Sequence, residues 1–164
     1  MKVFGITGWK NTGKTGLVER LVSEIVARGF TVSTVKHAHH SFDVDHEGRD
    51  SYRHREAGAR EVLLSSGNRW ALMHELRGAP EVPLADLLTK LTPVDLVLVE
   101  GFKAEGHSKI ECHRAATGKD ILAKTDASIV ALASDTQVDL AQPVFDLNDT
   151  AAIADFVLEQ VGLK

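Results

Sequence analysis

The sequence predicts an α/β fold, a three-layer domain with a mostly parallel sheet and a small β-hairpin insertion. Segments rich in β-branched residues alternate along the chain with segments of helical periodicity, which is typical of a parallel sheet with crossover helices. Residues 95–100 predict a strand, and its apolar run 96–99 has no alternation, which indicates burial on both faces at the centre of such a sheet. A chain of 164 residues has the length of one compact unit, so we expect a single domain over residues 1–164.

The N-terminal part predicts a strand, a loop, a helix and a second strand in that order. An apolar strand is expected over residues 2–6, and a helix over 16–26 follows a glycine-rich loop. Residues 31–36 are largely β-branched and predict the second strand. A polar loop rich in histidine covers 37–48, and residues 49–58 predict a short helix.

A β-hairpin is predicted in the middle of the chain. Two apolar segments, 61–65 and 69–74, flank the turn-forming residues 66–68. A helix over 83–91 follows, and it begins with a proline, which is well tolerated in the first helical turn.

The C-terminal part predicts two more strands and a final helix. Residues 109–113 predict an edge strand, and residues 128–133 predict a central strand because they are uniformly apolar. The last helix is expected over 150–161, with Asn148 or Asp149 as its N-cap.

The composition excludes several classes of partner. The formal net charge of −4 gives no reason to expect binding to nucleic acid or to an anionic membrane. The single cysteine, Cys112, allows no disulfide framework and is expected to be a small buried hydrophobe in a reducing cytoplasm. No segment has the length and hydrophobicity of a membrane span or a signal peptide, so we expect a cytoplasmic protein.

Residues 8–15 form a complete G-x-x-x-x-G-K-[ST] phosphate-binding loop between the first strand and the first helix. Gly8 and Gly13 let the chain bend so that successive backbone N–H groups can converge on one anion. Lys14 supplies positive charge for the terminal phosphates, and the Thr15 hydroxyl is suited to hold Mg²⁺. The loop therefore predicts a P-loop NTPase fold that binds a nucleoside triphosphate with Mg²⁺.

A second ligand for the metal is predicted at Glu100. This residue ends the apolar strand that covers 95–99, and ligands of open α/β sheets bind at the carboxyl ends of their strands. Gly101 follows and leaves room for a phosphate or a water molecule. The alternative interpretation is a charged residue that simply ends a strand at the surface.

The polar segment 37–46 follows the second strand and is expected to pass over the same edge of the sheet. Its histidines could bind a transition metal, although without cysteine or a defined helix their spacing equally fits a solvated loop. Hydrolysis of a bound nucleotide needs a positioned water, with charge stabilised by Lys14 and the metal. The catalytic candidates besides Lys14 are Asp45 and Asp50, with Asp43 beside them.

A reader for the nucleotide base is predicted at Asp135, directly after the strand that ends near residue 133. A carboxylate there can accept two hydrogen bonds from the N1 and N2 edge of guanine and does not match adenine. Residues 124–126 resemble part of a guanine-reading N-K-x-D motif but precede that strand. A turn-forming role for Asp135 is the alternative.

Several of these motifs together carry a family resemblance. They are the phosphate loop 8–15; residues 35–40; Phe42, Asp43, Asp45, Gly48, Asp50 and Ser51; Arg53; and residues 57–59, 99–103 and 133–135. The chain resembles the molybdopterin-guanine dinucleotide biosynthesis protein B family over nearly its full length. The K-H-x-H-H segment and the later E-G-F-K are more specific to this family than the phosphate loop alone.

The resemblance implies a homodimeric GTP-binding protein with weak GTPase activity. Such proteins assist the molybdenum cofactor guanylyltransferase, which joins GMP to molybdopterin. For this chain the resemblance assigns phosphate binding to part of the loop, and we add two neighbouring residues. The resulting set is Gly8, Lys10, Asn11, Thr12, Gly13, Lys14, Thr15 and Gly16. It also implies contacts to Mg²⁺ or water at Thr15 and Glu100.

The chain departs from the wider class of such proteins at Trp9. Many members carry a lysine directly after the first loop glycine, and that lysine acts across the dimer. Here the lysine comes one residue later, at Lys10, so the sequence does not support that mechanism. Two other functions remain open: a small-molecule kinase, and a metal-delivery GTPase that carries nickel or zinc on the histidine segment.

Overall fold

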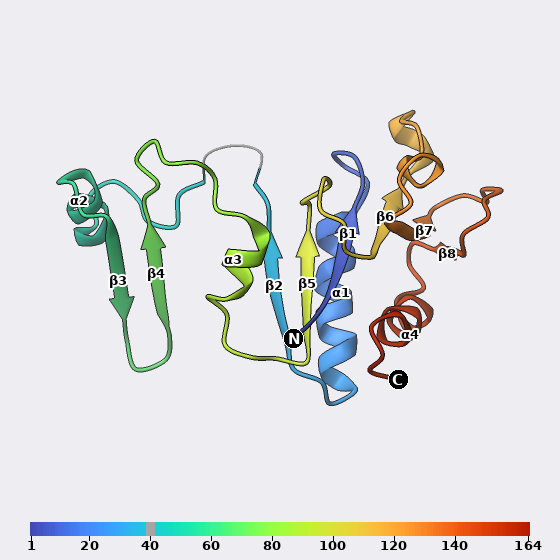
Figure 1. Cartoon of the computed structure of the whole chain (residues 1–164), viewed down its shortest axis with the longest axis horizontal. Helices are drawn as coiled ribbons and strands as arrows, with labels where there is room; N and C mark the ends of the chain where they lie inside the picture. Colours follow the sequence, from blue (N-terminus) through green and yellow to red (C-terminus); the bar gives the residue numbers. More distant parts are fainter. Residues whose placement is uncertain (39–41) are drawn as a thin grey trace. The chain divides into compact units, whose positions relative to one another are not determined.

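The chain folds into two compact units, which are coloured by sequence in Figure 1. The structure is a computed structural model and describes residues 1–38 and 42–164. The first unit combines Met1–His37 with Leu88–Lys164, and the second is Ala38–Leu87. The second unit is thus an insertion in the first, and the expectation of one domain over residues 1–164 stays a prediction.

The first unit is built on a six-stranded sheet with the strand order β2-β5-β1-β6-β7-β8, and every neighbouring pair is parallel. The strands are β1 (Lys2–Thr7), β2 (Val32–Lys36), β5 (Leu96–Glu100), β6 (Lys109–His113), β7 (Ile129–Ser134) and β8 (Val144–Asp146). The prediction of an α/β fold with a mostly parallel sheet is confirmed. β5 is buried along its whole length, as its uniformly apolar sequence predicts.

The prediction of an edge strand over residues 109–113 is wrong. This strand, β6, lies between β1 and β7, and all of its residues are buried. Its alternating polar residues look like an exposed face, but the structure gives them buried partners. Glu111 accepts hydrogen bonds from the backbone N–H groups of Leu122 (3.0 Å) and Ala123 (2.8 Å). Burial raises the pKa of Glu111 all the same. The short strand β8 was not predicted from the sequence.

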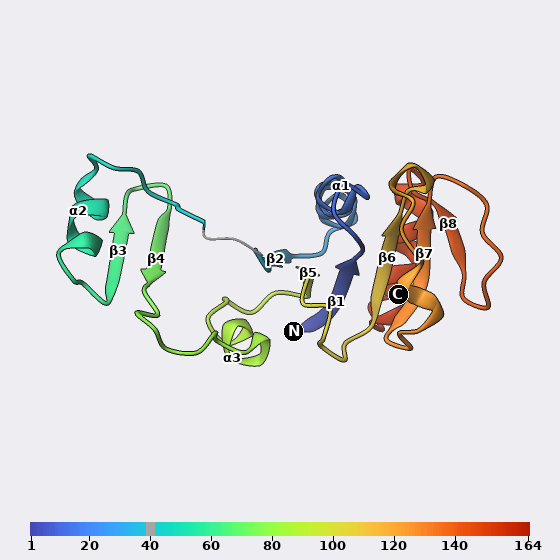
Figure 2. The same ribbon diagram turned by 90° about the horizontal axis from the view of Figure 1, so that it is seen from above.

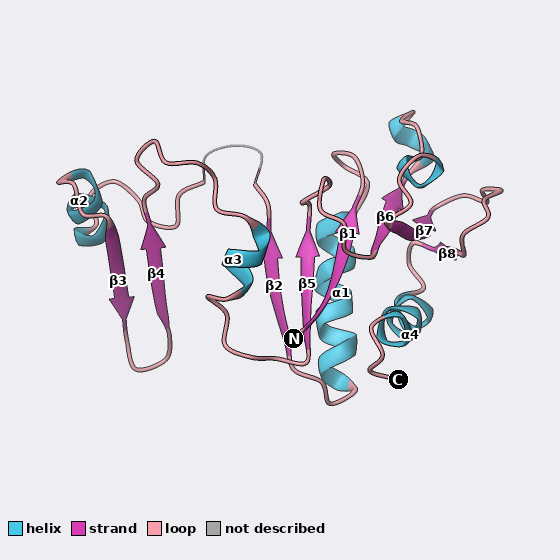
Figure 3. Ribbon diagram, in the orientation of Figure 1, coloured by secondary structure: helices cyan, strands magenta, loops and turns pink. Residues whose placement is uncertain are grey.

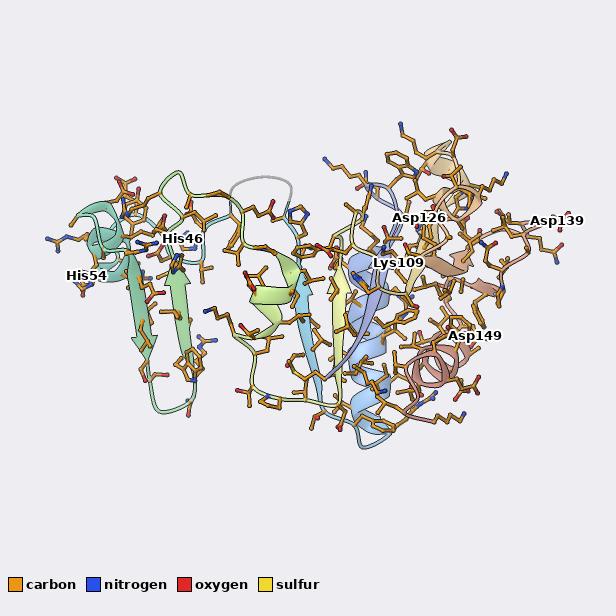
Figure 4. The ribbon with its side chains drawn as sticks, viewed as in Figure 1. His46, His54, Lys109, Asp126, Asp139 and Asp149 are labelled. Atoms are coloured by element: carbon orange, nitrogen blue, oxygen red, sulfur yellow. The ribbon has the colours of Figure 1, made fainter. Side chains whose placement is uncertain are left out.

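Lys109, at the start of β6, is fully buried. Its ammonium donates to the backbone carbonyls of Lys103 and Glu105 and to Ser128 Oγ at 2.8 Å. Asp126 in turn accepts a hydrogen bond from Ser128, and Figure 4 shows Lys109 and Asp126 on neighbouring parts of this unit. The lysine therefore joins the loop after β5 to the turn before β7.

Two long helices, α1 (Lys14–Ala27) and α4 (Thr150–Gln160), share one hydrophobic core with the sheet. The buried residues of α1 include Leu17, Leu21 and Ile25, which recur every four positions on one helix face. Figure 2 shows α1 to one side of strands β2, β5 and β1. Asp149 caps α4 by accepting from the Ala152 N–H at 3.1 Å, which confirms one of the two predicted caps.

Cys112 is fully buried within β6, as expected for a small hydrophobe. Burial raises the pKa of its thiol to about 12, so the thiol stays protonated at neutral pH. Among the described residues, none of the helices has the length and apolar composition that crossing a bilayer requires.

The second unit contains the predicted hairpin, formed by β3 (Glu61–Ser65) and β4 (Trp70–His74) in antiparallel register. Figure 3 shows these strands in magenta with the short helix α2 (Asp50–Glu56). Helix α3 (Leu84–Leu88) follows the hairpin and is shorter than the sequence predicts. The chain also forms two 3-10 turns between β6 and β7, η1 (Ala115–Thr117) and η2 (Leu122–Lys124).

Candidate phosphate-binding site

The loop 8–15 connects β1 to α1 at the edge of the sheet where the parallel strands end (Figure 1). Gly13 is the N-cap of α1 and has a left-handed conformation, with φ of 96°. Because glycine lacks a side chain, this N-cap makes no capping hydrogen bond to the first helical N–H groups. The first N–H groups of α1 therefore face the loop, and the positive end of the helix dipole favours an anion there. This is the local structure that the motif predicts.

Gly8 shows why the loop needs glycine at its first position. Its φ is 134°, and a Cβ on this residue would lie 2.4 Å from the Cys112 carbonyl oxygen and 2.9 Å from Thr12 Oγ1. No side chain can be accommodated at such distances unless the backbone moves. The loop thus lies directly against β6.

The Trp9 carbonyl organises the loop. It accepts hydrogen bonds from Thr12 Oγ1 at 2.8 Å and from Lys14 Nζ at 2.6 Å. Burial lowers the pKa of Lys14, Cys112 and Glu100 oppose this shift, and the ammonium groups of Lys103 and Lys36 add to it. Lys14 therefore lies close to Glu100 and to two further ammonium groups.

Glu100, at the end of β5, lies beside the loop as predicted. Its Oε1 accepts a hydrogen bond from Thr15 Oγ1 at 3.1 Å. The ammonium of Lys36 lies 3.3 Å from the same Glu100 oxygen and 3.4 Å from Thr15 Oγ1. The structure thus brings together the two residues predicted to hold the metal, and it adds a lysine to them.

The chain turns sharply after Glu100. Gly101 and Phe102 both have positive φ, 93° and 47°, and the Phe102 ring packs on the ring of His37 at 4.7 Å between centroids. The next residue, Lys103, places its ammonium 4.4 Å from the centroid of the Trp9 ring. A non-glycine residue with positive φ, such as Phe102, is strained, and such residues recur at functional sites. Here the turn is followed by a cation, Lys103, that lies against the phosphate loop.

Two adjoining depressions lie at the loop. One has a volume of about 420 Å³ and is lined by Asn11, Gly13, Lys14, Thr15, Gly16 and Arg114. The other, of about 470 Å³, is lined by Trp9, Lys10, Asn11, Arg114, Ala116, Thr117 and Lys119. Asn11 and Arg114 line both, so the two depressions adjoin each other. Their basic linings suit an anionic ligand that is longer than a single phosphate.

Asp135 lies next to this site through Arg114. Its Oδ1 accepts a hydrogen bond from the Ala115 N–H at 2.9 Å, and its Oδ2 lies 4.0 Å from Arg114 Nη1. The carboxylate therefore supports the turn that follows β6, which agrees with the turn-forming alternative. Recognition of a base by Asp135 stays a prediction.

Asp45 and Asp50 belong to the second unit. Asp45 is buried, and its Oδ1 accepts from Arg55 at 2.9 Å. Asp50 lies at the first turn of α2, where its carboxylate is 3.9 Å from the Arg53 guanidinium. Asp45 thus holds the fold of its own unit, and the catalytic roles of both residues stay predictions.

The predicted metal role of the histidine segment finds no support in the part of the chain that the structure describes. Within residues 1–38 and 42–164, no three histidine, cysteine or acidic side chains gather as a metal site. His39 and His40 lie outside the described residues. Figure 4 labels His46 and His54, which both belong to the second unit.

Sequence reasoning missed the cations that surround the loop. Lys36, Lys103 and Arg114 each follow or end a strand at the same edge of the sheet as Glu100. Their positions at strand ends could have predicted that they lie near Glu100, because the ends of parallel strands meet at one edge of the sheet. Their contacts with Glu100, Trp9 and the loop are set by tertiary structure and are not visible in the sequence.

Comparison with known proteins finds relatives in one family. The family model described as molybdopterin guanine dinucleotide synthesis protein B matches residues 3–135. The chain is 41% identical over 158 residues to a molybdopterin-guanine dinucleotide biosynthesis adapter protein from Haemophilus influenzae, covering 94% of this chain and 86% of that protein. Its counterpart in Escherichia coli strain K12 is 39% identical over 162 residues, covering 96% and 91%.

A solved structure shows the same fold. The crystal structure of a MobB protein homologue from Bacillus stearothermophilus superposes with a TM-score of 0.74 and is 29% identical, with each chain fully covered. The range that the family model matches includes the phosphate loop 8–15 and Glu100. The chain therefore belongs to the molybdopterin guanine dinucleotide synthesis protein B family.

Proposed function

We propose that the protein binds GTP together with Mg²⁺ at the phosphate loop and acts as an adapter in molybdopterin-guanine dinucleotide synthesis. The observation that carries the nucleotide part is the contact between Thr15 and Glu100 beside the uncapped start of α1. A polyphosphate on the loop amides would meet Lys14, and a metal between Thr15 and Glu100 would neutralise its remaining charge.

The oxygen atoms of Thr15 and Glu100 fit magnesium. Mg²⁺ takes octahedral oxygen ligands at about 2.1 Å, so two neighbouring ligands lie about 3 Å apart. The two side-chain oxygens lie 3.1 Å apart. A metal held by Thr15 and Glu100 would supply positive charge that stabilises the bound phosphates. Lys14 would bind the same phosphates, and the loop amides would orient them.

The adapter role is proposed from the relatives. The proteins from Haemophilus influenzae and Escherichia coli are named molybdopterin-guanine dinucleotide biosynthesis adapter proteins. We propose that this chain likewise assists the molybdenum cofactor guanylyltransferase, with molybdopterin as the other ligand of their complex. We also propose that the bound GTP is hydrolysed slowly, as the family resemblance implies.

A homodimer is the proposed assembly. The hairpin exposes apolar side chains on one face. Leu63 and Leu72 pair across the two strands, and Trp70 lies on the same face, two residues before Leu72 in β4. A two-stranded sheet is marginally stable by itself, so an apolar face on it favours a covering partner. A second copy of the chain would supply such a cover.

The proposed function predicts GTP-dependent capture of the guanylyltransferase. Immobilised wild-type protein should retain the purified transferase more strongly with Mg²⁺–GTP than with Mg²⁺–ATP or without nucleotide. Titration of the protein with GTP and ATP should give the same order of affinities. Equal binding of the two nucleotides would remove guanine recognition from the proposal, and no capture under any condition would remove the adapter role.

Asp135→Asn is expected to shift nucleotide preference from GTP toward xanthosine triphosphate. Asparagine can donate to the xanthine carbonyl, whereas aspartate accepts from the guanine amino group. The Asn amide oxygen can still accept from the Ala115 N–H, so the turn should persist. Competition titrations with both nucleotides measure the shift. Asp139→Asn, in the exposed loop after β7 (Figure 4), is the control, and an unchanged preference in Asp135→Asn would exclude Asp135 from the base site.

A further inference from the structure

Lys36 contacts both groups that are suited to hold the metal. It is the last residue of β2, and the parallel register places it opposite Glu100 on β5. Its ammonium lies 3.3 Å from Glu100 Oε1 and 3.4 Å from Thr15 Oγ1. Those two oxygens also contact each other, so the three groups form one compact cluster. A cation is therefore already in contact with the oxygens that would coordinate Mg²⁺.

We propose that Lys36 is a tethered cation that neutralises Glu100 in the metal-free protein and that Mg²⁺ must displace. The inference rests on the proposed function, because it takes Thr15 and Glu100 as the residues that face the metal. It assigns Lys36 a role that is separate from phosphate binding by Lys14. Lys36 holds Glu100 against Thr15 before the nucleotide arrives, and it competes with the metal for the same oxygens.

Electrostatics explains why the two cations exclude each other. A metal bound between Thr15 and Glu100 would lie within a few ångströms of an ammonium left in its present place, and the two positive charges would repel. A divalent ion gains more from the Glu100 carboxylate than a single ammonium does, so the metal wins when it is abundant. The observed contacts of Lys36 and the binding of Mg²⁺ are thus alternatives.

The exposure of the two side chains indicates which one can move. The Lys36 side chain is 57% exposed, whereas that of Glu100 is only 11% exposed. Lys36 can therefore swing into water at little cost, while Glu100 is held by its surroundings. The movable group lies where the chain leaves β2, one residue before His37, whose backbone N–H donates to the Glu100 carbonyl at 2.9 Å.

Lys103 offers a matched control. The ammonium groups of Lys36 and Lys103 both lower the pKa of Lys14, so both act on the same site. Lys103, however, places its charge over the Trp9 ring at 4.4 Å. Removing Lys103 should change the general positive potential of the loop, whereas removing Lys36 should also remove a direct competitor of the metal.

The test measures how much Mg²⁺ tightens GTP binding. The Kd for GTP is determined in Mg²⁺ and in EDTA for the wild type and for Lys36→Ala, Lys36→Arg and Lys103→Ala. The ratio of the Kd in EDTA to the Kd in Mg²⁺ should rise about two- to fivefold in Lys36→Ala, which is the range for one partly exposed ion pair. It should stay near the wild-type value in the other two variants. An equal or smaller ratio in Lys36→Ala would overturn the proposal.

A second measurement separates this inference from the proposed function. Mn²⁺ alone is titrated into the nucleotide-free protein and followed by its electron paramagnetic resonance signal. Lys36→Ala should bind Mn²⁺ about two- to fivefold more tightly than the wild type, and equal or weaker binding would refute the role of Lys36. Failure of the wild type to bind GTP would instead refute the proposed function. The Mn²⁺ titration would still decide whether Lys36 competes with the metal.

Discussion

Lys14→Ala is expected to weaken binding of Mg²⁺–GTP by about a hundredfold or more. Two charge-assisted hydrogen bonds to phosphate contribute roughly 1.5–3 kcal/mol each, and 1.4 kcal/mol corresponds to a factor of ten. In the structure the ammonium donates to the Trp9 carbonyl, and Lys14 is the first residue of α1. Its loss should therefore leave the fold intact. Equilibrium titration with a fluorescent GTP derivative measures the affinity.

The control for this variant is Lys2→Ala, which removes an exposed lysine at the other end of β1. Its net charge matches that of Lys14→Ala, so the comparison separates a local contact from the overall charge of the chain. Circular dichroism and thermal unfolding should show that both variants are folded. If Lys14→Ala bound GTP with wild-type affinity, the assignment of the phosphate-binding site would be wrong.

Gly8→Ala is expected to destabilise the protein by roughly 2–4 kcal/mol and to abolish nucleotide binding. Backbone strain at a glycine-only conformation costs about 1–3 kcal/mol, and overpacking adds a similar amount. The added Cβ would meet the Cys112 carbonyl oxygen at 2.4 Å, and this backbone atom belongs to the buried strand β6. Either the loop or the strand must shift. Urea unfolding and GTP titration measure the two effects.

Gly16→Ala is the matched control in the same segment. Gly16 lies within α1, and a Cβ there would have Arg20 Nη1 as its nearest neighbour at 3.5 Å. Alanine is a better helix former than glycine, so this variant should be more stable by about 0.5–1 kcal/mol. A Gly8→Ala protein as stable as the wild type would show that the loop does not pack against β6 as the structure has it.

The sequence predicts the phosphate loop and its neighbours well because their signals are local. A strand, a glycine-rich loop and a helix are adjacent in the chain, and Glu100 follows a strand whose apolar run is unmistakable. The N-cap Asp149 and the hairpin likewise depend on a few consecutive residues. Each of these features can be recognised without knowing what packs against it.

The features that sequence reasoning missed depend on partners far along the chain. β6 was predicted as an edge strand because the buried partners of Glu111 lie in a 3-10 turn eleven or more residues later. The contact between Lys36 and Glu100 requires the register of two strands, which neither strand specifies by itself. The approach of Lys103 to Trp9 follows a residue, Phe102, whose positive φ its residue type disfavours.

The parallel register of three strands has a consequence for how this site tolerates change. Ile6, Glu100 and Lys36 occupy one row across β1, β5 and β2. Because side chains alternate between the two faces of a sheet, a slip of β5 by one residue would turn Glu100 away from Thr15 and disturb the core at the same time. The inserted unit, Ala38–Leu87, lies in the chain between Lys36 and Glu100 and contributes no residue to this row. Insertions, deletions and sequence drift in that unit can therefore accumulate without moving the acidic and basic groups at the phosphate loop.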